Sequence, residues 1–270
     1  MPELPEVETT RRGIAGPLTG RRVDDAVVRN ASLRWPVPAH LTTLLSGQTL
    51  RQIDRRAKYL LLRFERGTLI IHLGMSGSLR ILPTATAPEK HDHFDLTFGD
   101  VTLRLRDPRR FGAVLWHEGD DRDHALLASL GPEPLGDDFS GAALHAALAR
   151  RQCAIKLAIM DSSVVVGVGN IYASESLFRA RLRPGTAARR LTLPQTTRLA
   201  DEIRQTLRDA LAAGGSTLRD FLHADGKPGY FQQSYFVYGR EGEPCRVCAT
   251  PIRNRRLGSR STFFCPACQR

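Results

Sequence analysis

The sequence predicts an α+β protein: a strand-rich N-terminal part that opens with one helix, then a helical region and a short cysteine-containing end. Three observations support this prediction. From about residue 22 to 116, short alternating segments are separated by turn residues, which is typical of an antiparallel β-sandwich. After Gly131-Pro132-Glu133-Pro134, apolar residues recur at helical spacing. Four of the five cysteines lie close together near the C-terminus.

The opening segment predicts a helix over residues 4–18. Leu4, Val7, Ile14 and Leu18 recur at helical spacing, so we expect them to form one buried face. Burial of that face would keep the N-terminus from fraying.

Pro2 is a candidate nucleophile at this start. If Met1 is removed, as is usual before a small residue, Pro2 carries a free secondary amine beside the Glu3 carboxylate. An α-amine titrates near pH ~7.7 to 8.0, so part of it is uncharged and nucleophilic near neutrality. With a sugar aldehyde carbon this amine would form an iminium, which is an electron sink at any pH. Alternatively, Pro2 and the acidic residues after it only favour a helix start.

Eight predicted strands follow, interrupted by one short helix at 39–46. They are Val23–Arg29, Thr49–Arg55, Tyr59–Phe64, Thr68–Leu73, Leu79–Leu82, Phe94–Phe98, Val101–Arg106 and Ala113–Trp116. Lys58 opens the third strand, on the same face as Leu60 and Leu62. Such a lysine either extends to solvent or points into a cleft, where desolvation suits its amine to proton transfer.

Two loops combine turn residues with apolar side chains. Gly74-Met75-Ser76-Gly77 carries a methionine, and Asp107-Pro108-Arg109-Arg110-Phe111-Gly112 carries two arginines and a phenylalanine. Such side chains ordinarily fold back on the core. On a basic protein, however, they match the apolar wedges that enter a base stack when a base is extruded.

The cluster His91-Asp92-His93-Phe94-Asp95 has two histidines but no evident third metal ligand. We therefore expect polar residues at a strand edge, with His91 facing an anionic substrate.

The helical region is predicted to begin after a boundary near 120–135, with helices at 140–150, 153–160, 170–180 and 194–213. Between them, Val166-Gly167-Val168-Gly169-Asn170 only half matches a dinucleotide fingerprint, and the helical context argues against a Rossmann site. The glycines would present free N–H groups to a phosphate, with Asn170 as the helix cap. A plain helix corner is the alternative. Glycine-rich residues from 214 to 232 predict a mobile loop.

Charge and cysteine spacing indicate the partners. The net charge of +11 favours a polyanion such as nucleic acid. Only four of 39 basic residues are lysines, which draws attention to Lys58 and Lys156. Cys245, Cys248, Cys265 and Cys268 have the C-x2-C-x16-C-x2-C spacing of a structural zinc site, which we favour over disulfides.

With no membrane-length apolar run and no signal peptide pattern, we expect a cytoplasmic protein.

Together these motifs resemble the bacterial formamidopyrimidine-DNA glycosylases over nearly the whole chain. The resemblance rests on Pro-Glu-Leu-Pro-Glu-Val-Glu, Arg-Arg-Ala-Lys-Tyr-Leu, His-Leu-Gly-Met-Ser-Gly, Asp-Pro-Arg-Arg-Phe-Gly, Val-Gly-Asn-Ile-Tyr-Ala-Ser-Glu and the cysteine segment. It implies a monomer with a catalytic β-sandwich over 1–130, a helix-two-turn-helix DNA-binding domain over 131–232 and a zinc β-hairpin over 235–270. The implied partner is duplex DNA containing oxidised purines.

The resemblance also implies the chemistry and the site residues. The activity would be base excision by a Schiff base on Pro2, followed by β,δ-elimination as an AP lyase. The implied catalytic residues are Pro2, Glu3 as acid/base at the sugar, Lys58 for proton transfer in β-elimination, and Arg260 for δ-elimination. The implied DNA contacts are His91, Arg109, Arg151, Lys156 and Asn170, with Met75, Arg109 and Phe111 filling the gap left by the extruded base. One structural Zn²⁺ would be bound by the four cysteines.

Two alternatives remain at this point. The endonuclease VIII branch prefers oxidised pyrimidines, but its opening usually has Gly where Leu4 stands here. A zinc-dependent DNA-binding protein without catalysis would explain the charge and the cysteines. It would not explain Lys58 or the two apolar loops.

Overall fold

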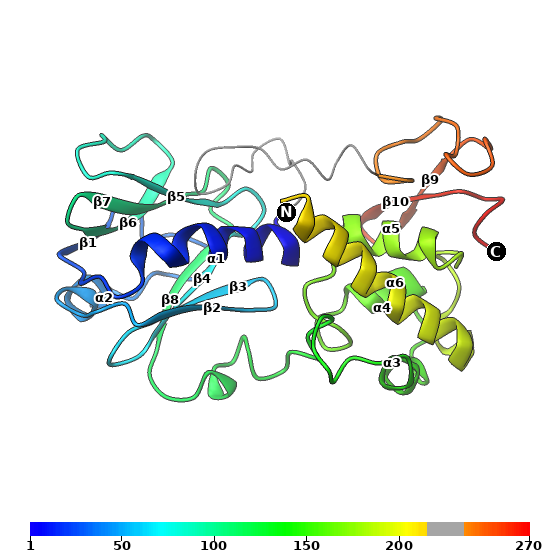
Figure 1. Cartoon of the computed structure of the whole chain (residues 1–270), viewed down its shortest axis with the longest axis horizontal. Helices are drawn as coiled ribbons and strands as arrows, with labels where there is room; N and C mark the ends of the chain where they lie inside the picture. Colours follow the sequence, from blue (N-terminus) through cyan, green and yellow to red (C-terminus); the bar gives the residue numbers. More distant parts are fainter. Residues whose placement is uncertain (215–234) are drawn as a thin grey trace. The chain divides into compact units, whose positions relative to one another are not determined.

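The computed structural model describes residues 1–214 and 235–270 (Figure 1). These form two compact units, which are described separately: Met1–Ala128, and Ser129–Ala212 together with the C-terminal residues from 235 onward. Except for Gly214, the loop predicted at 214–232 lies outside the described residues.

Helix α1 (Leu4–Leu18) confirms the predicted opening helix. Leu4, Val7, Ile14 and Leu18 are all fully buried. The helix contacts β2 and β3 of one sheet and β5 of the other, as Figure 1 shows for the dark blue helix. The apolar face thus ties the chain start to both sheets.

All eight predicted strands are present, in two antiparallel sheets, which confirms the sandwich. One sheet has the order β1 (Asp25–Val28), β6 (Asp92–Phe98), β7 (Val101–Arg106), β5 (Ser78–Pro83). The other has the order β2 (Gln52–Arg56), β3 (Tyr59–Arg63), β4 (Thr68–His72), β8 (Ala113–His117). Apolar residues of both sheets form one core, in which Leu60 and Leu62 of β3 join Leu103 and Leu105 of β7. Helix α2 (Leu41–Leu45) and a 3-10 turn, η1 (Asp121–Asp123), complete this unit.

The second unit contains the four predicted helices. They are α3 (Gly141–Leu148), α4 (Ile155–Met160), α5 (Asn170–Arg179) and α6 (Leu193–Ala212), with a 3-10 turn η2 (Ala188–Arg190). The long amphipathic α6 buries Leu199, Ile203 and Leu207 and packs against α3 and α5. Of the helices in the described ranges, none combines the length and apolar content that a membrane span needs.

A two-stranded hairpin, β9 (Arg253–Leu257) and β10 (Arg260–Phe264), closes the chain. Ile252, Cys245 and Cys265 pack with Phe178 of α5 and Val237 in a small apolar cluster. The cysteine segment is therefore attached to α5 by packing as well as by the chain.

Candidate functional site

The chain start is held in a fixed geometry. Pro2 is buried, and Glu3 is the N-cap of α1 with only 2% of its surface exposed. The Glu6 carboxylate accepts a 2.8 Å hydrogen bond from the Glu3 N–H, and the Glu3 side chain accepts from the Glu6 N–H in return. This capping box satisfies two N–H groups at the helix start. Glu6, which the sequence did not single out as a site residue, therefore positions Glu3 and the peptide that joins it to Pro2.

Charges from other elements reach this start. Burial lowers the pKa of the Met1 amine, the Glu3 and Glu6 carboxylates oppose that shift, and Lys58 and Arg109 lower the pKa further. Met1 precedes Pro2 here, so its amine stands in for the amine that Pro2 would carry after removal of Met1. The structure thus brings the start of the chain, Lys58 and Arg109 within electrostatic reach of one another in the N-terminal unit.

Lys58 lies in a tight turn and not in the strand that it was expected to open. Arg56 of β2 pairs with Tyr59 of β3, so Ala57 and Lys58 form the hairpin turn. Ala57 adopts a positive φ of 55°, and its carbonyl accepts a 2.8 Å bond from Arg55. Lys58 is half-buried. The two-residue connection therefore fixes where the lysine emerges from the sheet.

The two loops that carry Met75 and Phe111 meet at their backbones. Gly74 has φ of +63°, and a Cβ built on it would lie 2.4 Å from the carbonyl carbon of Phe111. Only glycine permits so close an approach. Phe111 is 45% exposed, Met75 is half-buried, and the Arg109 guanidinium lies 4.9 Å from the centre of the Phe111 ring. We call Met75, Arg109 and Phe111 the wedge.

Asp107 holds the second of these loops in shape. It is fully buried, and its carboxylate accepts the Gly112 N–H at 2.7 Å and the Ser76 hydroxyl at 3.3 Å. One carboxylate therefore ties both wedge loops together. Sequence reasoning assigned Asp107 only the role of a turn former.

His72 is a further residue that sequence reasoning missed. It ends β4, and its Nδ1 accepts the Gly74 N–H at 3.0 Å. Burial, with the charges of Lys58 and Arg34, lowers the pKa of His72 to about 4. The ring lies 4.9 Å from the Tyr59 ring. The feature of the sequence that could have identified His72 is its position directly before the Leu73-Gly74-Met75 turn.

His91, His93 and Asp95 form hydrogen bonds and ion pairs in and beside strand β6, and they do not form a metal site. The Asp107 N–H donates to the His91 carbonyl at 3.0 Å, and the His93 Nε2 lies 2.9 Å from the Asp107 carbonyl. Asp95 is paired with Arg29 and Arg104. Within residues 1–214 and 235–270, the four C-terminal cysteines are the only group suited to bind a metal. His91 is half-buried beside the wedge loop.

In the second unit, Lys156 occupies a different environment from the one expected of a DNA contact. It is fully buried in α4, and its Nζ donates to the Ser261 carbonyl at 2.8 Å and to the Thr262 hydroxyl at 2.9 Å. Both acceptors belong to β10. A direct phosphate contact does not fit this burial, whereas a bond that positions the strand beginning at Arg260 does.

Asn170 is the first residue of α5 and not its cap, which is Gly169. The expected cap was therefore wrong by one position, because Gly169 already has the extended backbone that a cap needs. The Asn170 Oδ1 is buried without a hydrogen-bond partner. Arg151 pairs with Asp161 at 2.6 Å and donates to Ser163 at 3.0 Å.

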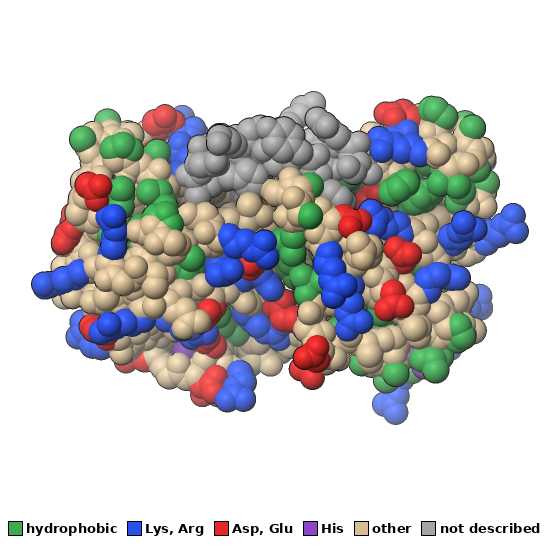
Figure 2. Space-filling view, in the orientation of Figure 1, with side chains coloured by type: hydrophobic (Ala, Val, Ile, Leu, Met, Phe, Trp, Pro, Cys, Tyr) green, Lys and Arg blue, Asp and Glu red, His purple; other side chains and the backbone are tan. Residues whose placement is uncertain are grey.

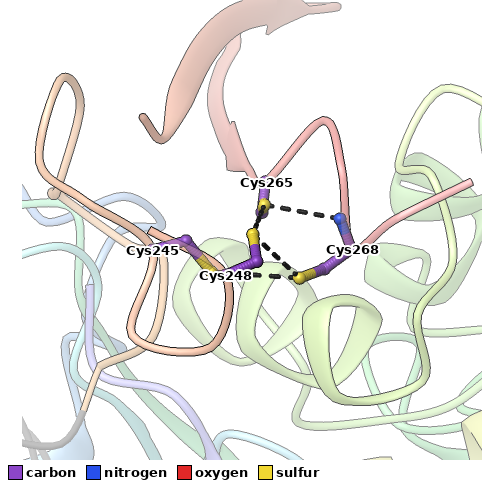
Figure 3. A group of neighbouring side chains, drawn as sticks. All are labelled: Cys245, Cys248, Cys265 and Cys268. Carbon is purple, nitrogen blue, oxygen red and sulfur yellow. Dashed lines mark hydrogen bonds between the residues drawn. The ribbon is translucent and has the colours of Figure 1, made fainter. Parts of the chain in front are cut away.

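The four cysteines meet at one point (Figure 3). Cys245 and Cys248 come from the loop before β9, and Cys265 and Cys268 follow β10. All four Sγ atoms lie within 4.8 Å of one another, with Cys248 3.5 Å from Cys265 and 3.4 Å from Cys268. A tetrahedral zinc with Zn–S bonds of about 2.3 Å separates its sulfurs by about 3.8 Å. The donor set and its spacing fit one structural Zn²⁺.

Arg260 lies exposed at the start of β10, and its neighbours Arg253, Arg255 and Arg256 on β9 are also exposed. On the face shown in Figure 2, Lys and Arg side chains lie among Asp and Glu side chains and do not form one uniform patch. Net charge alone therefore does not locate a DNA-binding surface. The exposed arginines of the β9–β10 hairpin, by contrast, are a local cluster of positive charge.

Comparison with known proteins gives consistent matches along the chain. The formamidopyrimidine-DNA glycosylase N-terminal domain matches residues 1–114, the formamidopyrimidine-DNA glycosylase H2TH domain matches 130–222, and the zinc finger found in FPG and IleRS matches 242–270. A Methylobacillus flagellatus protein named formamidopyrimidine-DNA glycosylase is 61% identical over 270 residues, covering 100% of this chain and 96% of that protein.

Solved structures agree with these matches. The MutM (FPG) protein from Thermus thermophilus is 40% identical with a TM-score of 0.90, and the match covers 99% of this chain and 98% of that one. A mutant of Lactococcus lactis FPG, solved in complex with a Fapy-dG containing DNA, is 32% identical with a TM-score of 0.94, and the match covers 100% of both chains.

Proposed function

The chain belongs to the formamidopyrimidine-DNA glycosylase family, a family of DNA glycosylases for oxidised purines, and we propose that it works through the amine of Pro2. The observation that supports Pro2 is its setting. It is buried at the start of the capped α1, next to Glu3 and within electrostatic reach of Lys58 and Arg109. A pinned amine among groups that can hold or move protons suits nucleophilic catalysis.

The reaction begins when the uncharged Pro2 nitrogen attacks C1′ of the damaged nucleotide. A bond forms from nitrogen to C1′, the glycosidic bond breaks, and the base leaves with its electron pair and takes up a proton, which balances the proton that the Pro2 nitrogen loses. Glu3 donates a proton to the ring oxygen as the sugar opens, and the product is the cationic iminium. The capping box keeps the Glu3 backbone in place through these steps.

The iminium then acidifies the C2′ proton, and its removal expels the 3′ phosphate in β-elimination. Lys58 is the proposed proton carrier, because the hairpin turn fixes its position and its charge reaches the chain start. Arg260 is proposed to bind phosphate and to assist the second, δ, elimination. Its exposure on the arginine-rich hairpin supports this role.

The proposed DNA contacts divide between the two units. In the N-terminal unit, the wedge would fill the gap left by the extruded base, and His91 would lie close to the DNA. In the second unit, Arg151 and the N-terminus of α5 around Asn170 would bind the phosphate backbone. Lys156 would act indirectly, through its bonds to β10.

One zinc bound by the four cysteines stabilises the hairpin, and the partner is duplex DNA carrying oxidised purines. We propose functional boundaries at 1–130, 131–232 and 235–270, and action as a monomer in the cytoplasm.

Borohydride trapping on a lesion-containing duplex tests the nucleophile. We expect the protein that begins at Pro2 to form a covalent adduct with DNA, because borohydride reduces the iminium to a stable amine. The matched control carries a removable N-terminal tag: trapping should disappear with the tag and return after its cleavage. Robust trapping by the tagged protein would refute Pro2 as the nucleophile.

The same experiment separates this function from the non-catalytic alternative. A zinc-dependent DNA-binding protein would bind the duplex with or without the tag and form no adduct in either case.

A further inference from the structure

A cavity of about 650 Å³ lies on the N-terminal unit beside the wedge. Two loops line it: Ser32, Leu33 and Arg34 come from the segment after β1, and Arg109, Arg110 and Phe111 come from the loop before β8. Arg34 and Arg110 have no part in the proposed chemistry. The cavity nevertheless shares two residues, Arg109 and Phe111, with the wedge.

The two walls of this cavity are joined by a backbone hydrogen bond. The Arg34 N–H donates to the Gly112 carbonyl at 3.1 Å, so the segment after β1 is bonded to the wedge loop. Leu33 is 9% exposed and belongs to the main core. The Ser32 N–H donates to the Asn30 side chain at 2.9 Å. The cavity therefore needs little ordering before it can bind a ligand.

Three arginine charges on the rim have no ion-pair partner among the described residues. Many arginines of this unit pair with carboxylates, as Arg29 and Arg104 do with Asp95. Arg34, Arg109 and Arg110, by contrast, form no ion pair within the described parts of the chain. Three guanidinium groups on one rim, with no counter-charge from residues 1–214 or 235–270, favour an external anion.

Aromatic rings orient two of these guanidinium groups. Arg34 lies 4.7 Å from the centre of the Trp35 ring, and Arg109 lies 4.9 Å from that of Phe111. Stacking uses the flat face of a guanidinium and leaves the N–H donors at its edge available. Those donors match the oxygens of a phosphate, which arginine binds with two parallel hydrogen bonds.

The third arginine sits on a strained backbone. Arg110 has φ of +56°, an unusual value for a residue with a side chain, and its N–H donates to the Asp107 carbonyl at 3.2 Å. The buried Asp107 thus maintains the conformation that puts Arg110 on the cavity rim. Strain of this kind persists only where the surrounding structure enforces it, often at binding sites.

We propose that this cavity is a phosphate subsite in which Arg34 and Arg110 bind a backbone phosphodiester of the DNA, next to the bases that the wedge separates. The proposal rests on the proposed function, because the phosphate belongs to the same duplex. It adds Arg34 and Arg110 to the DNA contacts and commits to the DNA backbone, not to a free nucleotide.

The test measures the affinity for a lesion-containing duplex over a salt series, for Arg34→Gln, Arg34→Lys and Arg110→Gln. Each phosphate contact contributes about 0.9 to the slope of log affinity against log salt concentration. We expect Arg34→Gln and Arg110→Gln to lose about one unit of slope each, and Arg34→Lys to keep it. Arg51→Gln is the matched control, since Arg51 is exposed and paired with Glu65. Thermal unfolding checks that every variant is folded.

An unchanged slope in Arg34→Gln, an equal loss in Arg51→Gln, or an equally shallow slope in Arg34→Lys would overturn the subsite. Inorganic phosphate or a mononucleotide that binds as tightly as the duplex, and loses binding in the same variants, would identify a free-ligand site and overturn the DNA assignment. Failure of the proposed function looks different: the unmodified protein would then form no borohydride-trapped adduct at all.

Discussion

The surroundings of His72 keep its imidazole neutral. Its Nδ1 accepts a hydrogen bond from the Gly74 N–H, so the ring proton belongs on Nε2. Burial and the charges of Lys58 and Arg34 lower its pKa to about 4. Protonation would turn the acceptor into a donor and break the bond that shapes the Met75 turn.

We therefore expect His72 to make stability depend on pH. The pKa of an unfolded histidine is near 6.5, so between pH ~6.5 and 4 the unfolded chain binds a proton that the folded chain does not. Through this residue, the free energy of unfolding has its full value above pH ~6.5 and falls by about 3 kcal/mol as the pH drops to about 4. Urea unfolding over this range should show a flatter profile for His72→Gln than for the unmodified protein.

His40→Gln is the control for that experiment, because His40 is an exposed histidine in the same unit. Its unfolding profile should match that of the unmodified protein. If His72→Gln also leaves the profile unchanged, His72 is not the residue that couples pH to stability.

Single residues also show where sequence reasoning stops. The scarcity of lysine drew attention to Lys58 and Lys156, but it could not reveal that Lys156 is buried against β10. Two bonds between residues about one hundred positions apart depend on tertiary packing alone. The N-cap of α5 was predicted one residue too late, at Asn170 instead of Gly169, because both residue types favour an N-cap.

At the scale of elements, the hairpin depends on its metal. The segment from Tyr235 to Arg270 has a small apolar cluster, of which Cys245 and Cys265 are part. We expect chelation of the zinc, or Cys248→Ala, to remove hydrogen-exchange protection from β9 and β10 and to weaken DNA binding, because such small modules owe their folding to the metal.

Elemental analysis should find one zinc per chain before chelation. Cys153→Ala is the matched control: Cys153 is exposed and lies outside the cluster, so zinc content and protection should not change. Active protein without zinc would contradict the structural role of the metal.

Helix α5 holds the segment 236–238, which leads into this hairpin, through the side chain of Glu175. Glu175 is 1% exposed, and its carboxylate accepts the backbone N–H groups of Phe236, Val237 and Tyr238 at 2.8 to 3.0 Å. Burial raises the pKa of Glu175, and these three bonds oppose that shift. One side chain therefore supplies the acceptor for three consecutive donors.

Loss of that acceptor should be costly. A buried N–H left without a partner costs about 1–3 kcal/mol, so Glu175→Ala should destabilise the second unit by about 3 kcal/mol or more. Chemical denaturation followed by hydrogen exchange at 235–238 would measure it. Glu202→Ala, a half-buried position on α6, should cost far less. If both variants lose the same free energy of unfolding, the three hydrogen bonds to Glu175 do not stabilise the unit.

The positions of the strands and helices followed from the sequence because alternation and helical spacing report burial directly. Every predicted strand between 22 and 116 has a counterpart, and only the ends differ by a few residues. Lys58 illustrates the difference: the pattern of period two extends through the turn, but the pairing of Arg56 with Tyr59 removes Lys58 from the strand.

At the scale of the whole molecule, substrate choice is best measured on the intact protein. We expect excision of 8-oxoguanine to be at least about tenfold faster than excision of an oxidised pyrimidine, a difference of about 1.4 kcal/mol in the barrier. Single-turnover excision from two duplexes that differ only in the lesion measures this ratio. A preference for the pyrimidine would move the protein to the endonuclease VIII type.

The order of motifs along the chain was enough to predict the family and the α+β fold. The sequence could not predict which motifs touch. Met75 and Phe111 come from two separate loops, and these loops meet where Gly74 approaches the Phe111 backbone. Contacts between backbones leave no periodic pattern that could be read in advance.

That approach has a practical consequence for protein engineering. Because Gly74 fits against the Phe111 carbonyl and Asp107 bonds to both Ser76 and Gly112, we expect that neither loop can be exchanged by itself for a segment that lacks these residues. A chimera designed to read a new lesion would have to transplant both segments, and Asp107 with them, as one cassette.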